Sequence, residues 1–543
     1  MKALTLTLIL ISTLVLSLFP TYLYADDYYI NPIFGDDSNP GTSKAPWKKI
    51  AKANSVLNSG DTVHLMAGTY DETIRPAKSG SSGKYITYAA YNDDVVTIGG
   101  QIKYGADLSD RSWIKINGLR FSDTSYFWIQ FYPNGSHNYI TNCQFKSTGA
   151  SMNWAGVYIK GRADYNKIIN NSFVSACLPS DLIDIRASSY NLIEGNYFGI
   201  TNHTALALSG KDGKTEYNII RNNTLQNKYH HNLEVYHNAD YTLVEGNKIL
   251  DAGDACDSDS CHANTCGSDR DRNTFRRRDY NSMKLMSKYC IVRNNLFVNN
   301  GTFDMYSYGL GSGEYAIGNR IYNNTSYGNY RAMLVNPPSD GPVSNNIIKN
   351  NIYSNSHVDS LYFNPKVVDT SNRFLTNNYF NTPVIFKYVS GVSNVESEYS
   401  SEWNGNSSLT DINPGFINTN ARNFCLRGDS KIIDKGTWLT VITSPSGSGI
   451  SFTVNDARYF SDGFGLIPAD KIQIQNQSFS VRIKSIDYTS NRIELESSVS
   501  WNKGDGISLP YSGDKPDIGA FEYGLIQANA ESSLSAPSLS IKK

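Results

Sequence analysis

The sequence has little of several features that would decide its class at once. Its 543 residues include 49 Lys+Arg and 50 Asp+Glu, so no excess of one charge favours nucleic acid or an anionic membrane as a partner. Only seven residues are cysteine, and an odd number leaves at least one thiol outside any intramolecular disulfide. Beyond the N-terminus, no apolar run is long enough to span a bilayer. We therefore expect no nucleic-acid partner and no membrane span in the mature chain.

The long apolar run of this chain lies at its N-terminus, from Ala3 to Phe19. With Met1 and Lys2 before it, the run predicts a signal peptide over residues 1–25, with an uncleaved anchor as the alternative. We expect the mature chain to be exported, as a secreted, periplasmic or cell-surface protein.

The central part of the chain repeats itself. From about residue 116 to 380, a β-branched residue or Leu is followed three positions later by Asn, or once by Cys. The steps between these positions are 24 to 29 residues, apart from one of 48 residues. A fixed period in this range is typical of a solenoid, and the alternating Val, Ile, Tyr and Phe predict coils made of strands. The repeated positions are Cys143, Asn171, Asn196, Asn223, Asn247, Asn295, Asn324, Asn351 and Asn378. We interpret them as structural, because an Asn amide at a bend can bond to the same amide one coil above.

Distinct segments flank the repeat. Before it, the sequence predicts a strand, a turn, an amphipathic helix from about Trp47 to Leu57 and a strand at 62–66. Residues 83–91 (GKYITYAAY) follow as the first-coil segment. After it, residues 436–513 alternate polar and apolar residues between Gly-rich turns, which predicts a small antiparallel β module. Residues 516–523 (PDIGAFEY) follow this module, and the tail 525–543 is rich in Ser and Ala, which favours disorder.

With this repeat, helical cap, first-coil segment and closing segment, the chain resembles the secreted right-handed parallel β-helix proteins of the pectate-lyase-like superfamily. The resemblance implies an all-β fold, with a right-handed parallel β-helix and its N-terminal helical cap at 26–435, the small module at 436–513 and a closing β-helix motif at 514–524. Within the superfamily the chain resembles polysaccharide lyases of the chondroitinase B, alginate lyase and lysine-base pectate lyase types. We expect a monomer whose partner is an acidic polysaccharide.

One strand of each coil carries the candidate site. Five of these strands align so that their second and fourth residues are apolar and point into the core, which turns the third and fifth residues outward. One outward row reads Tyr158, Asp184, Ala207, Glu234 and Lys284, and its neighbour begins with Lys160, Arg186, Ser209 and Tyr236. Because parallel strands lie ~4.8 Å apart, we expect Lys284 beside Glu234 and Asp184 about 10 Å from Glu234.

The step of 48 residues contains an insertion at about 251–281, directly before the strand of Lys284. Long loops on a rigid scaffold commonly carry function. Acidic residues of the insertion, such as Asp254, suit Ca²⁺, although their spacing does not match an EF-hand. Its cysteines (256, 261 and 266) favour a disulfide over a zinc site, because their spacing is unusual for zinc and export permits disulfides.

The resemblance to polysaccharide lyases implies roles for these residues. Lys284 matches the base that removes the proton alpha to a uronate carboxylate, and Arg186 is a candidate partner for the carboxylate or the leaving group. Candidate Ca²⁺ ligands are Glu234, Asp184 and Asp254, and candidate substrate-binding residues are Lys160, Tyr158, Tyr236, His231 and His237. A free carboxylate at Glu234 would favour the charged form of Lys284, which is not a base, so this role requires Glu234 to be committed to a cation.

Three functions stay open at this point. The first is a lyase that cleaves an acidic polysaccharide by β-elimination. The second is a glycoside hydrolase that uses Asp184 and Glu234, whose side chains can approach the ~6.5–9.5 Å of an inverting pair. The third is a non-catalytic carbohydrate-binding or cell-surface protein, because a fold does not determine a function. A surface pair of Glu234 and Lys284 without a catalytic role is the plain structural alternative.

Overall fold

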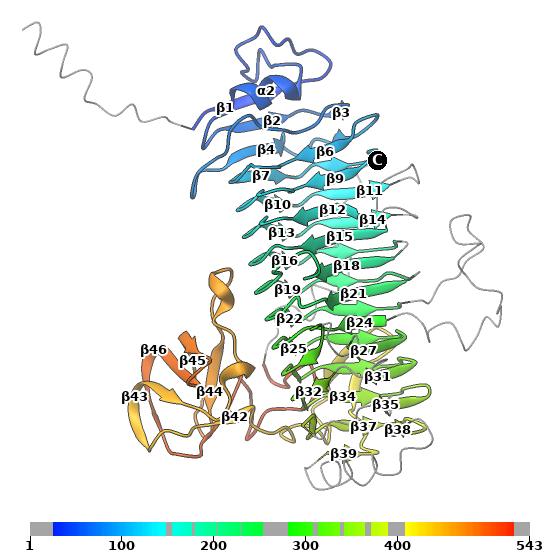
Figure 1. Cartoon of the computed structure of the whole chain (residues 1–543), viewed down its shortest axis with the longest axis vertical. Helices are drawn as coiled ribbons and strands as arrows, with labels where there is room; N and C mark the ends of the chain where they lie inside the picture. Colours follow the sequence, from blue (N-terminus) through cyan, green and yellow to red (C-terminus); the bar gives the residue numbers. More distant parts are fainter. Residues whose placement is uncertain are drawn as a thin grey trace, which may run out of the picture.

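The computed structural model describes residues 25–147, 155–175, 180–201, 203–228, 230–252, 281–307, 313–336, 342–363, 371–388 and 408–525. The predicted signal sequence up to residue 24, Asp254 and the cysteines of the insertion, and the tail beyond residue 525 lie outside this range. The described chain forms a parallel β-solenoid whose coils stack along the long axis of the molecule (Figure 1). Among its helices, none has the length and apolar character needed to cross a membrane.

The solenoid is built from three parallel sheets, to which successive coils contribute one strand each. The first sheet contains β1 (Asp27–Ile30), β2 (Thr62–Leu65), β4 (Ile86–Ala90), β7 (Ile114–Asn117), β10 (Tyr139–Thr141), β13 (Lys167–Ile169), β16 (Leu192–Glu194), β19 (Ile219–Arg221), β22 (Leu243–Glu245), β25 (Ile291–Arg293), β29 (Arg320–Tyr322), β33 (Ile347–Lys349) and β36 (Arg373–Leu375). The second contains β3 (Gly68–Tyr70), β5 (Val96–Ile98), β8 (Arg120–Phe121), β11 (Gln144–Ser147), β14 (Ser172–Ser175), β17 (Tyr197–Phe198), β20 (Thr224–Leu225), β23 (Lys248–Leu250), β26 (Leu296–Val298), β30 (Thr325–Tyr327), β34 (Ile352–Ser354), β37 (Asn378–Phe380) and β39 (Leu409–Thr410).

The third sheet carries the two predicted outward rows. Its strands are β6 (Tyr104–Asp107), β9 (Phe127–Gln130), β12 (Ala155–Lys160), β15 (Asp181–Arg186), β18 (Thr204–Ser209), β21 (His231–Tyr236), β24 (Asn281–Leu285), β27 (Thr302–Tyr306), β31 (Arg331–Asn336), β35 (Asp359–Phe363) and β38 (Phe386–Tyr388). A helix, α2 (Ile50–Val56), lies at the N-terminal end of the stack, as the amphipathic pattern predicts (Figure 1). It buries Ile50 and Ala53 against the first coils, so that apolar surface at this end is removed from water.

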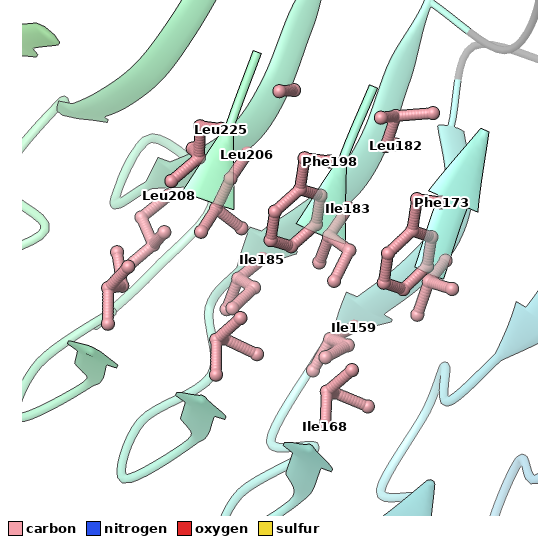
Figure 2. Packing of buried hydrophobic residues seen from close by; sticks show 14 of the residues in the cluster. Ile159, Ile168, Phe173, Leu182, Ile183, Ile185, Phe198, Leu206, Leu208 and Leu225 are labelled. Atoms are coloured by element: carbon pink, nitrogen blue, oxygen red, sulfur yellow. The ribbon is translucent and has the colours of Figure 1, made fainter. Parts of the chain in front are cut away.

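Side chains of like shape stack inside the solenoid, because each coil places the same position one strand spacing above the last. The rings of Phe121, Phe145, Phe173 and Phe198 stack in sequence with centroid distances of 5.0, 4.5 and 4.9 Å. On the third sheet, Ile183 and Ile185 point inward and pair with Leu206 and Leu208 of the next coil (Figure 2). This continuous core is the main stabilising element of the coils.

The repeated Asn residues form the predicted ladder. The backbone N–H of each one donates to the side-chain oxygen of the next, as Asn223 does to Asn247 (3.0 Å) and Asn247 to Asn295 (2.9 Å). The prediction of Asn378 as the last member is wrong, since Asn351 donates to Asn377 instead, over 2.9 Å. The residue before a ladder position usually has positive φ, as in the pairs Asn170-Asn171 and Gly195-Asn196, and at the last rung Thr376 takes this conformation.

A second Asn ladder, which the sequence analysis missed, runs along another bend. Its members include Asn138, Asn166, Asn191 and Asn218. Each of the first three donates from its backbone N–H to the side-chain oxygen of the next over 2.9 Å. A signal for it was present, because these residues stand one position before the first-sheet strands at the same period.

The predicted C-terminal antiparallel β module is confirmed, and it packs against the side of the solenoid (Figure 1). Its sheet comprises β42 (Thr440–Val441), β43 (Gly447–Thr453), β44 (Lys471–Ile474), β45 (Ser480–Asp487), β46 (Arg492–Trp501) and β47 (Gly506–Ser508), with short 3₁₀ turns at Ala457–Tyr459 and Gly463–Gly465. Apolar residues of the module share a core with the outer face of the first sheet, where Leu243 and Ile291 lie. Arg293 of β25 donates to Asp470 of the module (2.6 Å) and to Glu245 (2.6 Å).

The segment that precedes the module covers part of the second sheet. Its hairpin, β40 (Phe416–Asn418) and β41 (Asn423–Leu426), places Phe424 against Leu296 and Val298. A two-stranded sheet of β28 (Ala316–Ile317) and β32 (Val343–Ser344) completes the described strands. The outer faces of two of the three solenoid sheets are therefore partly covered by the C-terminal part of the chain.

We expect the replacement of Asn247 by Ala to lower the free energy of unfolding by about 3 kcal/mol, because it removes buried hydrogen bonds to Asn223 and to the Ile220 carbonyl on the preceding coil. Urea unfolding measures the effect. Asn502→Ala, at an exposed turn, is the control and should stay within about 0.5 kcal/mol of the parent. Equal stability of the two variants would contradict the structural role of the ladder.

Candidate functional site

The predicted outward row is confirmed by the register of the third sheet. Tyr158 pairs with Asp184, Asp184 with Ala207, Ala207 with Glu234 and Glu234 with Lys284. The row continues in both directions beyond the predicted five, through Gln130 and Asp107 on one side and through Asp304, Leu334, Tyr362 and Lys387 on the other. The neighbouring row of Lys160, Arg186, Ser209 and Tyr236 is also in register.

Glu234 and Lys284 form the centre of the site. Their side chains come within 4.0 Å, although 50 residues of sequence separate them. The buried carboxylate of Glu234 also accepts a hydrogen bond from the Thr204 hydroxyl (3.2 Å). The Lys284 ammonium lies 4.9 Å from the ring centroid of Tyr306 and 6.0 Å from that of Tyr236. Lys284 is thus placed among a carboxylate and two aromatic rings at the outer surface of the sheet.

Asp184 and Arg186 form a second charged group, three coils from Lys284. The Nε of Arg186 donates to both carboxylate oxygens of Asp184, over 3.1 and 2.9 Å. Burial raises the pKa of Asp184 to about 7, against the opposing effect of Arg186. Asp212, which sequence reasoning did not single out, forms an ion pair with Lys160 (2.8 Å). Three strand spacings, or about 14 Å, separate the backbones of Arg186 and Lys284.

The predicted histidines differ in their surroundings. His231 accepts the backbone N–H of Asn281 at Nδ1 (2.9 Å), and burial lowers its pKa well below the usual value, so it is neutral and carries its proton on Nε2. His237 lies 2.9 Å from Glu314. His203 was missed because it stands alone before its strand. Its Nδ1 lies 2.8 Å from Asp181, and this hydrogen bond raises the pKa of His203.

Asp304, one strand beyond Lys284 in the same row, was also missed by sequence reasoning. Its signal was available, since residues 302–306 (TFDMY) alternate like the earlier strands. The carboxyl is buried, and its Oδ1 has no hydrogen-bond partner among the described residues. Burial raises its pKa to about 7. On the next strand, Arg331 donates to Asp359 (2.7 Å) and lies over the ring of Tyr362 at 4.0 Å. The site therefore extends over at least four more side chains than predicted.

The predicted Ca²⁺ ligands do not come together in the described part of the chain. Asp184 is engaged by Arg186 and lies two strands from Glu234, while Asp254 falls outside the described residues. Within the described ranges, no group of three or more His, Cys, Asp and Glu side chains is arranged to hold a metal ion. Calcium binding stays a prediction, and we assign no step of the chemistry to it.

Cys143 and Cys290 are buried thiols that act as small core residues. The predicted disulfide of the insertion lies outside the described residues.

We expect Asp304→Asn to change the pH dependence of stability. Between about pH 4 and pH 7, the unfolded chain releases the Asp304 proton while the folded chain keeps it, so ionisation lowers the stability of the parent as pH rises. The stability of the parent relative to Asp304→Asn should fall over this window, by up to about 4 kcal/mol, and level off above pH 7. Urea unfolding of both proteins from pH 4 to 8 measures the difference, and a constant difference would contradict the burial of a protonated carboxyl.

Two protein-family models match the chain. The Pel9A-like right-handed β-helix region matches residues 28–177, and a general right-handed β-helix region matches residues 104–268. Both agree with the solenoid seen in the structure and with the predicted handedness.

Curated relatives match short segments. An uncharacterized protein, YwoF of Bacillus subtilis, is 33% identical over 127 residues, which are 21% of this chain and 27% of YwoF. A lacto-N-biosidase of Bifidobacterium longum subsp. longum is 38% identical over 73 residues, which are 12% of this chain and 5% of that enzyme. The chain thus spans about a quarter or less of the length of either relative.

Among solved structures, the pectate lyase Pel9A aligns over 92% of this chain and 97% of its own, with 15% identity and a TM-score of 0.45. With the family-model matches and the observed sheets, the comparisons identify the described chain as a right-handed parallel β-helix, similar to the Pel9A-like family over its first coils.

Proposed function

We propose that the protein is an exported enzyme that cleaves an acidic polysaccharide by β-elimination, with Lys284 as the base. The observation that carries this proposal is the position of Lys284, which projects outward between Glu234 and Asp304 on one row of a sheet face. Such a row can hold a polymer along the solenoid, because successive coils present side chains at a constant spacing of ~4.8 Å.

The reaction needs a base that removes the proton alpha to the uronate carboxylate and an acid that protonates the departing oxygen. Lys284 supplies the base from its neutral form. Asp304, buried and with a pKa raised to about 7, holds a proton near neutral pH and lies one strand away, so it is the candidate acid. Arg331, two strands from Lys284, and Arg186, three strands away, are the cations that can pair with carboxylates of neighbouring sugar units. Each does so alongside the carboxylate that it already binds, Asp359 for Arg331 and Asp184 for Arg186.

Substrate recognition is assigned to the remaining side chains of the two rows. Tyr236 and Tyr306 bracket Lys284 with aromatic rings that suit the apolar face of a sugar. His231, neutral and with Nε2 as a donor, suits a hydroxyl group. His237 and Lys160 are held by Glu314 and Asp212, so each can contact substrate only alongside that carboxylate.

Lys284→Ala should reduce cleavage at least ~100-fold, because the base is removed. The measurement is ultraviolet absorbance of the unsaturated product from polygalacturonate, alginate and chondroitin sulfate, each with and without a chelator. Lys288→Ala, four residues further along the chain and outside the rows, is the matched control and should keep parental activity.

Two other outcomes would replace the proposal. New reducing ends without absorbance, lost in Asp184→Asn or Glu234→Gln, would identify a hydrolase, the class to which the lacto-N-biosidase relative belongs by name. Retention of a polymer without turnover, by the parent and by Lys284→Ala alike, would identify a binding protein.

Lys284→Arg tests the base more directly. Arginine keeps the positive charge that faces Glu234, but its guanidinium stays protonated in proteins and cannot act as the base. Cleavage should therefore fall as far as in Lys284→Ala, as measured by absorbance of the unsaturated product. Cleavage at the parental rate would show that the base is a group other than Lys284.

A further inference from the structure

An aromatic cluster lies on the third sheet, on the coils that precede the charged group. We call it the aromatic patch, and its members are Tyr104, Tyr126, Phe127, Tyr132 and Tyr158. Neighbouring rings are close, with centroid distances of 5.7 Å for Tyr104 and Tyr126, 4.9 Å for Phe127 and Tyr158, and 6.3 Å for Tyr132 and Tyr158. These rings come from three successive strands, β6, β9 and β12, or from residues beside them.

The aromatic patch is continuous with the rows of the candidate site. Tyr158 is the residue before Asp184 in the row that leads to Lys284. Tyr132 extends the neighbouring row, because Tyr158 pairs with Gln130 and Lys160 therefore lies level with Tyr132. Tyr104 pairs with Phe127 on the adjacent strand. A polymer that lies along these rows at Lys284 therefore passes over the patch.

Part of the aromatic patch is exposed, and it carries cations. Tyr126 and Tyr132 have exposed fractions of 36% and 45%, whereas Phe127 and Tyr158 are buried beneath them. The Lys103 ammonium lies 4.9 Å from the Tyr126 ring centroid and 5.0 Å from that of Tyr104, and Lys160 lies 5.9 Å from Tyr132. Exposed rings beside ammonium groups suit a ligand with both apolar faces and negative charges.

A second aromatic series on the surface does not share these properties. Trp113, His137, Tyr165, Tyr190, Tyr217, Tyr241 and Tyr289 stack one upon another along a bend, with centroid distances of 4.5 to 5.3 Å. Their ring faces contact each other, so they present edges rather than faces to solvent. This series is therefore a structural ladder, like the Asn residues.

We propose that the aromatic patch is a remote subsite that binds sugar units of the same acidic polysaccharide several units away from the bond that is cleaved. Tyr126 and Tyr132 stack on the sugar rings, and Lys103 pairs with a carboxylate or sulfate of the polymer. Lys160, which is held by Asp212, contacts the polymer only alongside that carboxylate. Five to six strand spacings, or ~24 to ~29 Å, separate β9 and β6 from Lys284. The inference rests on the proposed function for the identity of the polymer, and it predicts a preference for long chains.

The test uses the full chain with Tyr126→Ala and Tyr132→Ala combined. The probes are polygalacturonate, alginate and chondroitin sulfate, each cast into a native gel, and the measurement is the retardation of the protein. The polymer that retards the parent most should bind the double variant about tenfold more weakly, because two stacked rings are lost. If the parent cleaves this polymer, KM should rise about tenfold for long chains and stay unchanged for short oligosaccharides, with kcat retained.

Matched variants separate stacking from a loss of fold. Tyr126→Phe with Tyr132→Phe keeps both rings and should bind as the parent does. Tyr523→Ala, at a tyrosine that is also 45% exposed but lies in the closing segment, should have no effect on retardation. Thermal unfolding of each variant shows whether the fold is intact. Should the alanine double variant unfold, the single variants Tyr126→Ala and Tyr132→Ala replace it, each with about a threefold loss expected.

The outcomes distinguish this inference from the proposed function. Cleavage or retardation that is equal in the parent and the folded alanine variants would overturn the subsite and leave the proposed function in place. Retardation that depends on Tyr126 and Tyr132 in a protein that cleaves none of the three polymers would support the subsite while the lyase proposal fails. A parent that none of the three polymers retards would overturn the subsite.

Discussion

Hydrogen bonding in register between successive coils is the constraint on which the rest of this structure depends. The backbone hydrogen bonds of the three sheets set the distance between coils. The Asn ladders set which residues of successive coils lie above one another, because each buried amide bonds only when its equivalent lies directly above it. Glu234 and Lys284 meet across 50 residues for this reason alone. The insertion between them changes the length of chain that separates the two residues without changing their distance in space.

The same constraint explains how much of the protein could be predicted from its sequence. The fold follows from the regular spacing of the repeated Asn residues, and the rows follow from the alternation of apolar and polar residues along each strand. Both patterns can be seen in the sequence itself. The error at the last rung arose because Thr376-Asn377-Asn378 offers two adjacent asparagines. In several earlier rungs the ladder residue is the second of two adjacent asparagines, which favours Asn378 here. In the structure, Phe374 is buried, Thr376 takes the positive φ of the bend, and Asn377 is the ladder residue. An ambiguity of one position is resolved only by packing.

The missed part of the site has a different cause. Asp304 belongs to a strand whose alternating pattern is visible in the sequence. It was missed only because the row was not followed beyond Lys284. In contrast, the pairing of Lys160 with Asp212, of His203 with Asp181 and of Arg293 with Asp470 depends on how loops and the C-terminal module fold back. No period relates such residues. Local patterns therefore predict the rows themselves, and tertiary contacts decide which members of a row are already engaged.

Buried charges in this protein occur in two kinds of environment. At the contact with the module, Arg293 is satisfied on all sides by Glu245, Asp470 and the Tyr322 hydroxyl. On the third sheet, Asp304 is also buried, yet one of its oxygens has no hydrogen-bond partner among the described residues. A satisfied network holds two parts together, whereas an unsatisfied carboxyl retains the capacity to bind or transfer a proton. The contrast supports the placement of chemistry on the third sheet.

The docked module has a mechanical consequence for that sheet. Its apolar core includes Leu192 of β16, and Lys349 of β33 donates to the backbone of Trp438, so the module spans six consecutive first-sheet strands from β16 to β33. In a linear array of repeats, each unit contacts only its neighbours, so one unit can unfold locally while distant units stay folded. Here the coils that carry Glu234, Lys284 and Asp304 lie within the bridged stretch, so opening any one of them also requires the module to detach. The module thereby couples the unfolding of these coils, so that they unfold together.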